Sequence, residues 1–226
     1  MNPTILQPGV TSLTVPLADA ALRGTLHLPT VATALIILAE AGPAPAARNE
    51  ALATVLQQAG LATLTLDLLT HAEERFRDPH HNVALLVKRL LAGVELIKRH
   101  IQLGDLPPLP IGLCAAGDCS PAIVRIAALR DGDIYALVCR DGLIDGAGML
   151  YLRSLKAPLL LLVQPGNEPA LASNRRALRE LSCVNELKVL PANSDGATRG
   201  ASLAALAHDA AQWFTRHLPR AKQPAG

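Results

Sequence analysis

Residues 109–119 read Leu-Pro-Ile-Gly-Leu-Cys-Ala-Ala-Gly-Asp-Cys, and residues 121–129 after them have a helical pattern. The apolar start of this stretch predicts a strand over Leu109–Leu113, and the residues between strand and helix predict a turn. A buried strand that feeds a helix in this way is the repeating unit of parallel sheets covered by helices. The stretch therefore favours an α/β fold.

The same alternation extends to both sides of this stretch. Upstream, residues 12–28 alternate apolar and polar side chains and predict an antiparallel hairpin with a turn near Ala18–Ala20. The sequence predicts one mostly parallel sheet with helices on both faces and this hairpin at its N-terminal edge. The remaining predicted strands are Ala34–Ala39, Ala62–Leu66, Ile134–Cys139, Pro158–Val163 and Asn185–Leu190, and the predicted helices are Asn49–Ala59, Asn82–His100, Pro121–Leu129, Ala170–Leu181 and Ala201–Leu218.

The composition is that of a folded protein with one sizeable core. Of 226 residues 50% are hydrophobic and 18% are charged, which excludes a disordered chain. We expect a single domain over residues 1–218 and a loose tail over residues 219–226. The 21 basic and 19 acidic residues leave a net charge of +2, and the basic residues are spread along the chain, so nucleic acid is not an expected partner.

No stretch of the sequence predicts a membrane span. The longest apolar runs, Val31–Ala39 and Ala157–Val163, fall short of the roughly 20 residues that cross a bilayer. The first residues lack a basic segment followed by an apolar one, so we expect no secretory signal and a cytoplasmic location. The four cysteines, Cys114, Cys119, Cys139 and Cys183, are then expected to be free thiols.

Five stretches, in this order along the chain, resemble the α/β-hydrolase fold. Within that fold the sequence is similar to dienelactone-hydrolase-like proteins, which occur alone or joined to phosphoribosyltransferase domains. The resemblance covers the whole chain and implies a mostly parallel central sheet with an antiparallel N-terminal hairpin. The stretches are Gly60–Thr70, Arg75-Phe76 with Leu85–Leu90, Leu109–Cys119, Val138–Gly142 and Ala157–Val163.

The resemblance also implies where catalytic residues would lie. The fold carries its nucleophile on a Gly-x-Ser-x-Gly turn, its acid after a later strand and its histidine after the last strand. Here Gly117 falls in the nucleophile position, Glu168 in that of the acid and Asp195 in that of the histidine. Glycine has no side chain to form an acyl-enzyme, and Asp195 adds like-charge repulsion beside Glu168. The oxyanion loop, residues 39–45, contains two prolines, which donate no N–H.

Two cysteines are alternative nucleophiles. Residues 112–117 also resemble the Gly-x-Cys-x-Gly-Gly turn of dienelactone hydrolases, which would make Cys114 the nucleophile. That alignment moves the turn three residues earlier, and no histidine lies between His100 and His208. Cys119 is a second candidate, because a helix N-terminus lowers the pKa of a thiol. We expect both cysteines to be structural.

No cofactor or metal site is expected. Glu40, Asp118, Glu168 and Asp195 would surround the former active-site mouth, where they could bind a cation or a basic side chain of a partner. We favour the alternative that these carboxylates face solvent or cap helices, as Asp118 could do before Pro121. The polar stretch with His71, His80 and His81 predicts a solvated loop. No glycine-rich nucleotide motif follows a strand, so NAD and ATP are not indicated.

Three functions of different class follow from these residues. The leading hypothesis is a catalytically inactive hydrolase-fold protein, retained as an interaction or assembly subunit with a protein partner or as a homo-oligomer. The second is a small-molecule binding protein that uses the remnant pocket, enlarged by Gly117. The third is a hydrolase of esters or lactones that uses Cys114 or Cys119 with a base that the sequence does not reveal.

Overall fold

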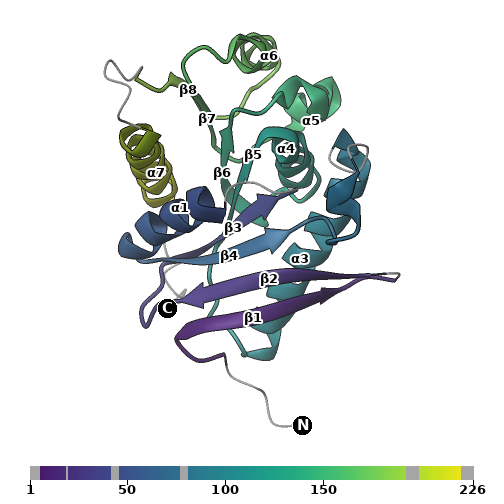
Figure 1. Cartoon of the computed structure of the whole chain (residues 1–226), viewed down its shortest axis with the longest axis vertical. Coiled ribbons are helices and arrows are strands. Elements are labelled where there is room, and N and C mark those ends of the chain that lie inside the picture. Colours follow the sequence, from purple (N-terminus) through teal and green to yellow (C-terminus); the bar gives the residue numbers. More distant parts are fainter. Residues whose placement is uncertain (1–5, 19, 42–45, 77–80, 192–198, 220–226) are drawn as a thin grey trace, which may run out of the picture.

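A computed structural model describes residues 6–18, 20–41, 46–76, 81–191 and 199–219. Its eight strands form one sheet in the order β1-β2-β4-β3-β5-β6-β7-β8, in which β3 to β8 are parallel and β2 is antiparallel to both β1 and β4 (Figure 1). The predicted fold class is confirmed. The strands are β1 Gly9–Pro16, β2 Ala21–Leu28, β3 Ala34–Glu40, β4 Leu61–Asp67, β5 Ile111–Ala116, β6 Ile134–Arg140, β7 Leu159–Val163 and β8 Asn185–Val189.

Helices cover both faces of the sheet (Figure 1). On one face α1 and α7 bury Leu52 and Phe214 against strand residues such as Ile36. On the other face α3 and α4 bury residues such as Val94 against strand residues such as Leu113. The helices are α1 Ala46–Gln58, α3 Val83–Leu103, α4 Ser120–Leu129, α5 Met149–Ser154, α6 Glu168–Leu178 and α7 Arg199–Arg216, and the short 3-10 helices are η1 Glu73–Arg75, η2 Gly117–Cys119 and η3 Ile144–Ala147.

Two features differ from the sequence prediction. Strand β5 continues to Ala116 instead of ending at Leu113, because Cys114 and Ala115 pair with both β3 and β6. Pairing on both sides therefore outweighs the low strand propensity of alanine. The second feature is the unpredicted pair η3 and α5, whose six-residue helix α5 is too short to show a helical period.

Gly112 allows α7 to lie close to the sheet. A Cβ atom at this position would lie 2.8 Å from both Phe214 Cε1 and Ile36 Cδ1. Because real Cβ atoms do not approach this closely, the absence of a side chain lets the Phe214 ring pack directly onto β5.

No helix in the described ranges is long and apolar enough to cross a bilayer. The predicted tail over residues 219–226 lies, after Pro219, outside the described residues.

Candidate functional site

The turn between β5 and α4 has the shape that this fold uses to present a nucleophile. Strand β5 ends at Ala116, and Gly117 follows it with a φ of 51° before the chain enters η2 and α4. A strained strand-to-helix turn of this kind holds the nucleophile at the top of an α/β-hydrolase sheet. A Cβ atom added at Gly117 would meet nothing within 4 Å. The position is therefore open, and it carries no nucleophilic atom.

Both alternative nucleophiles are buried. Cys114 lies within β5, opposite Leu38 of β3 and Val138 of β6, and is 1% exposed. Cys119 is also 1% exposed. Burial raises the pKa of the Cys114 thiol, and burial together with the charge of Asp118 raises the pKa of Cys119 to about 12. Because the thiolate is the reactive form of cysteine, this environment opposes attack by either residue.

We therefore expect at most one of the four cysteines to react quickly with Ellman's reagent in the folded protein at pH 8. Cys114, Cys119 and Cys139 are buried, and only Cys183 is partly exposed. In denaturant all four thiols should react, which provides the control. Fast labelling of Cys114 or Cys119 in the native protein, identified by mass spectrometry, would contradict this expectation and support a thiol enzyme.

A partly buried polar cluster lies beside the turn, at the carboxyl ends of β3, β4 and β6. Glu40 is opposite Asp67 across β3 and β4, and Arg140 ends β6. Arg140 Nη2 donates to Asn49 Oδ1 at 2.7 Å, and the Asn49 side chain in turn hydrogen-bonds to Glu40. Arg140 is 6% and Asn49 5% exposed. Within the described part of the chain, Glu40 Oε1 and Arg140 Nε are buried without a hydrogen-bond partner.

The surroundings of Glu40 favour its neutral form. Burial is the main cause, and the negative charge of Asp67 adds to it, so that the pKa of Glu40 is raised to about 7. Arg140 and Asn49 oppose this rise without cancelling it. Glu40 therefore changes its charge near neutral pH, unlike an ordinary surface glutamate.

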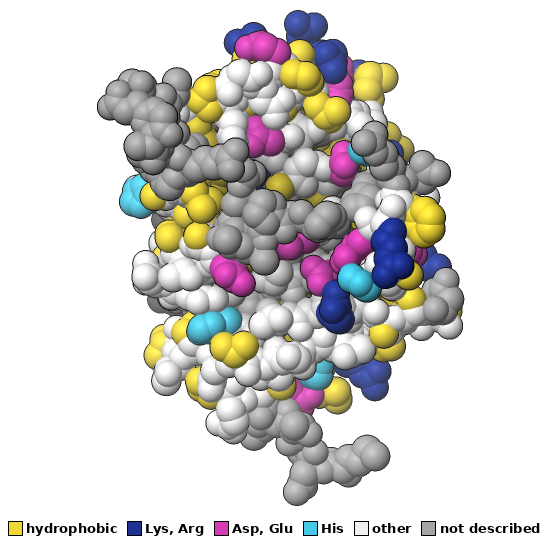
Figure 2. Space-filling view, viewed as in Figure 1, with side chains coloured by type: hydrophobic (Ala, Val, Ile, Leu, Met, Phe, Trp, Pro, Cys, Tyr) yellow, Lys and Arg dark blue, Asp and Glu magenta, His cyan; other side chains and the backbone are white. Residues whose placement is uncertain are grey.

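A histidine also reaches the turn. His81 Nδ1, just before α3, lies 3.2 Å from Asp118 Oδ2, and His71 Nδ1 lies 3.3 Å from Glu74 Oε2. The cap residue of α4 is Cys119 without a side-chain hydrogen bond, so Asp118 pairs with His81 and does not cap the helix. Figure 2 shows Asp and Glu side chains gathered near the middle of this face, with Lys, Arg and His side chains beside them.

Of the remaining predicted site residues, Glu168 does not join this cluster. Glu168 is exposed and begins α6, whose cap is Asn167. Asp195, His80 and residues 42–45 of the oxyanion loop lie outside the described residues. Within the described ranges, no three His, Cys, Asp or Glu side chains come together as metal ligands.

Sequence reasoning missed Asp67, Asn49, Arg140 and Asp141. Asp141 has a φ of 52°, and its Oδ1 accepts hydrogen bonds from Gln164 N at 2.8 Å and Asn167 Nδ2 at 3.1 Å, so it joins the ends of β6 and β7. Their position in the sequence could have identified three of them, because Asp67, Arg140 and Asp141 directly follow the ends of predicted strands. Carboxyl ends of parallel strands meet at one edge of a sheet, where ligands bind.

Comparison with known proteins finds two curated proteins of similar sequence. No family model matches the chain. Proteins of two strains of Mycobacterium tuberculosis, each named "Putative phosphoribosyl transferase", are 34% identical to it over 171 residues, which is 76% of this chain. The chain spans 38% of the length of these curated relatives.

Solved structures give matches that cover nearly the whole chain. The esterase domain of a Rhodothermus marinus protein (TM-score 0.73, 13% identity, 93% of this chain and 100% of that chain) and Est1E from Butyrivibrio proteoclasticus (0.72, 12%, 91% and 98%) share the fold. A dienelactone hydrolase from Anabaena variabilis matches with a TM-score of 0.81 and 33% identity over 95% of this chain and 100% of its own. The chain therefore belongs to the dienelactone hydrolase family of α/β-hydrolase-fold proteins.

Proposed function

We propose that this chain is a hydrolase-fold protein that has lost acyl-transfer chemistry and acts as an interaction or assembly subunit. The observation that carries the proposal is Gly117, which occupies the nucleophile turn with a φ of 51° and offers no hydroxyl or thiol. The burial of Cys114 and Cys119 supports it, because neither thiol can replace the missing nucleophile without a change of structure. A fold that has lost its chemistry still has surfaces on which partners can bind.

The direct test is hydrolysis of p-nitrophenyl acetate by the purified protein. We expect no turnover above that of the heat-denatured protein, and no difference between the wild type and the Cys114→Ala and Cys119→Ala variants. Turnover that disappears in one of these variants would overturn the proposal in favour of a cysteine hydrolase. Turnover that survives both substitutions would also overturn it and would require a nucleophile elsewhere in the chain.

For the partner we propose a protein of the phosphoribosyl transferase type. Support comes from the curated relatives, in which a segment similar to this chain makes up 38% of a longer polypeptide with that name. Domains joined in one polypeptide can contact each other through interfaces like those between separate proteins. The test is co-elution of this chain with a purified phosphoribosyl transferase from the same source in size-exclusion chromatography. Separate elution of the two proteins at high concentration would contradict this choice of partner.

A second candidate function is the binding of a small molecule at the remnant site. Two observations favour it: the open space at Gly117 and the unpartnered buried atoms of Glu40 and Arg140 beside it. A ligand that binds only the folded state raises the melting temperature. A screen of small esters, amides and acids by thermal shift tests this function, with Arg140→Met as the variant that should lose the response. A hit that shifts both proteins equally would place the binding elsewhere.

A further inference from the structure

The last strand of the sheet, β8, has an outer side with which no strand of the described residues pairs. It pairs with β7 on one side and, as far as the described residues extend, with no strand on the other (Figure 1). Leu159 N donates to Val184 O at 2.9 Å, and Leu190 N donates to Val163 O at 2.8 Å. In a parallel pair this pattern points the N–H and C=O groups of Asn185, Leu187 and Val189 away from β7.

Strand β8 lacks two of the features that block natural edge strands. Such strands are commonly blocked by proline, by a bulge or by charged side chains, lysine above all. Strand β8 has neither proline nor bulge, and Lys188 is held back against α7 by Asp209. Val189 at its end is 48% exposed, and Val184 just before it is 61% exposed. Among the described residues, the edge therefore offers both unpaired backbone groups and apolar surface.

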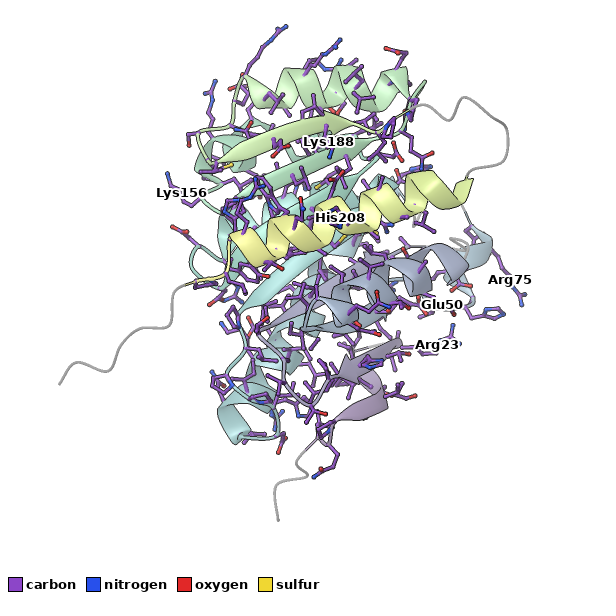
Figure 3. All side chains as sticks on the ribbon, turned by 90° about the vertical axis from the view of Figure 1, so that its left-hand side faces the viewer. Arg23, Glu50, Arg75, Lys156, Lys188 and His208 are labelled. Atoms are coloured by element: carbon purple, nitrogen blue, oxygen red, sulfur yellow. The ribbon has the colours of Figure 1, made fainter. Side chains whose placement is uncertain are left out.

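The charges beside the edge complement those of a second copy of the same strand. Lys188 Nζ lies 2.6 Å from Asp209 Oδ1 of α7, the helix that also carries His208 (Figure 3), and Glu186 Oε2 lies 4.0 Å from Arg216 Nη1. The side chains of Lys188 and Glu186 are still 43% and 48% exposed. Each has room for a further partner of opposite charge.

These charges select one register. Because the outward groups belong to alternate residues, two copies of β8 can pair antiparallel about Glu186, Leu187 or Lys188. Pairing about Glu186 places it opposite Glu186 of the second copy, and pairing about Lys188 places it opposite Lys188 of the second copy. Both arrangements are unfavourable because like charges repel. Pairing about Leu187 places Glu186 opposite Lys188 of the second copy, twice, and Asn185 opposite Val189 of the second copy.

We propose that two copies of this chain form a dimer through β8, paired antiparallel about a two-fold axis at Leu187, so that the two sheets continue into one. Charges then alternate across the interface in the order Arg216, Glu186, then Lys188 and Asp209 of the second copy. Such a contact is self-complementary, as two-fold symmetry requires. The dimer requires neither the absence of hydrolysis nor a phosphoribosyl transferase partner, so it can be tested separately from both.

The test is the mass of the full chain in solution, measured by light scattering after size-exclusion chromatography over a wide concentration range. We expect a dimer for the wild type. Val189→Pro removes an outward N–H without breaking the β7–β8 hydrogen bonds and should weaken the dimer by about tenfold or more. Val189→Ala is the matched control and should remain a dimer. A wild type that is monomeric at every concentration, or a Val189→Pro variant as dimeric as the wild type, overturns the proposal.

Two further variants keep the result unambiguous. Ser12→Pro blocks the opposite edge of the sheet, because Leu17 N donates to Ala20 O and the amide of Ser12 therefore faces away from β2. This variant should remain a dimer, and a monomer here would move the contact to β1. If Val189→Pro fails to fold by circular dichroism, Glu186→Lys provides the test, because it places two lysine side chains opposite each other across the interface. Glu186→Lys should be monomeric at low salt, and a dimer unaffected by this change contradicts the proposed register.

Discussion

Glu73→Ala is expected to lower the free energy of unfolding by about 3–5 kcal/mol, because it leaves a buried arginine without its counter-charge. The Arg89 side chain is 5% exposed. Its Nη1 donates to Glu73 Oε2 at 2.7 Å and to Leu68 O at 2.8 Å, and its Nη2 donates to Glu73 Oε1 at 2.6 Å. Glu73 also accepts hydrogen bonds from Thr70 N and Thr70 Oγ1. One carboxylate thus holds α3 to the segment that follows β4.

Urea unfolding at pH 7 measures the effect. The control is Glu180→Ala, which removes one partner of the pair Arg153–Glu180, in which the arginine side chain is 64% exposed. Exposed pairs of this kind contribute about 0–1 kcal/mol. A loss below about 1 kcal/mol in Glu73→Ala would show that water or another group satisfies Arg89 and that the pair is not needed for folding.

The same ion pair should contribute to stability in a defined pH range. The hydrogen bonds from Arg89 are the main reason that the pKa of Glu73 is lowered to about 2, from a usual value of 4.5. An acid with a lowered pKa stabilises the folded state fully above its unfolded pKa and progressively less as the pH falls. The difference in stability between wild type and Glu73→Ala should therefore decrease as the pH falls from 4.5 toward 2.

Much of the fold could be predicted from the sequence because its signals are local. The period of the apolar residues gave the strands from Ala34 onward, and the alternation in residues 12–28 gave the hairpin. The position of the turn depended on choosing between two registers that differ by three residues. The structure continues β5 to Ala116 and gives Gly117 the positive φ, as expected from the alignment that places Gly117 at the nucleophile position. Short strands of alanine and cysteine carry too little propensity to decide this from sequence alone.

The site was less predictable because its contacts join residues far apart in the chain. Glu40 could be named from the resemblance, but its neighbours Asp67 and Arg140 follow from the pairing of β3 with β4 and from the place of β6 in the sheet. His81 and Asp118 are separated by 37 positions, and only the packing of α3 beside the turn brings them to 3.2 Å. Sequence patterns report the period of each element and not which ends meet.

The environment at these strand ends disfavours the ionised form of Glu40, and its effect on the stability of the protein can be measured. In the folded chain its carboxyl group faces the like charge of Asp67 and is partly shielded from water, and the attraction of Arg140, whose Nη2 donates to Asn49, offsets this only in part. An acid whose pKa is raised by folding destabilises the folded state once the pH is high enough to ionise it. Acidic groups with strongly shifted pKa values cluster at functional sites.

Glu40→Gln is accordingly expected to stabilise the protein at pH 8, by about 1–3 kcal/mol. Below pH 4.5 the carboxyl group is protonated in both the folded and the unfolded state, so the variant should gain nothing there. Between pH 4.5 and about 7, the value to which the pKa is raised, the unfolded chain ionises first and the wild type loses stability. Glutamine does not ionise and avoids this loss.

Thermal melts of the wild type and Glu40→Gln from pH 4 to pH 8 test this, with the exposed helix residue Glu50→Gln as the matched control. The two curves should coincide near pH 4 and separate toward pH 8, and Glu50→Gln should follow the wild type throughout. A Glu40→Gln variant that is less stable than the wild type at pH 8 would mean that the ionised carboxylate is held by Arg140 and Asn49 more strongly than burial opposes it. The remnant site would then hold a buried ion pair instead of a neutral acid, and its ligands would have to be sought among groups that pair with a carboxylate.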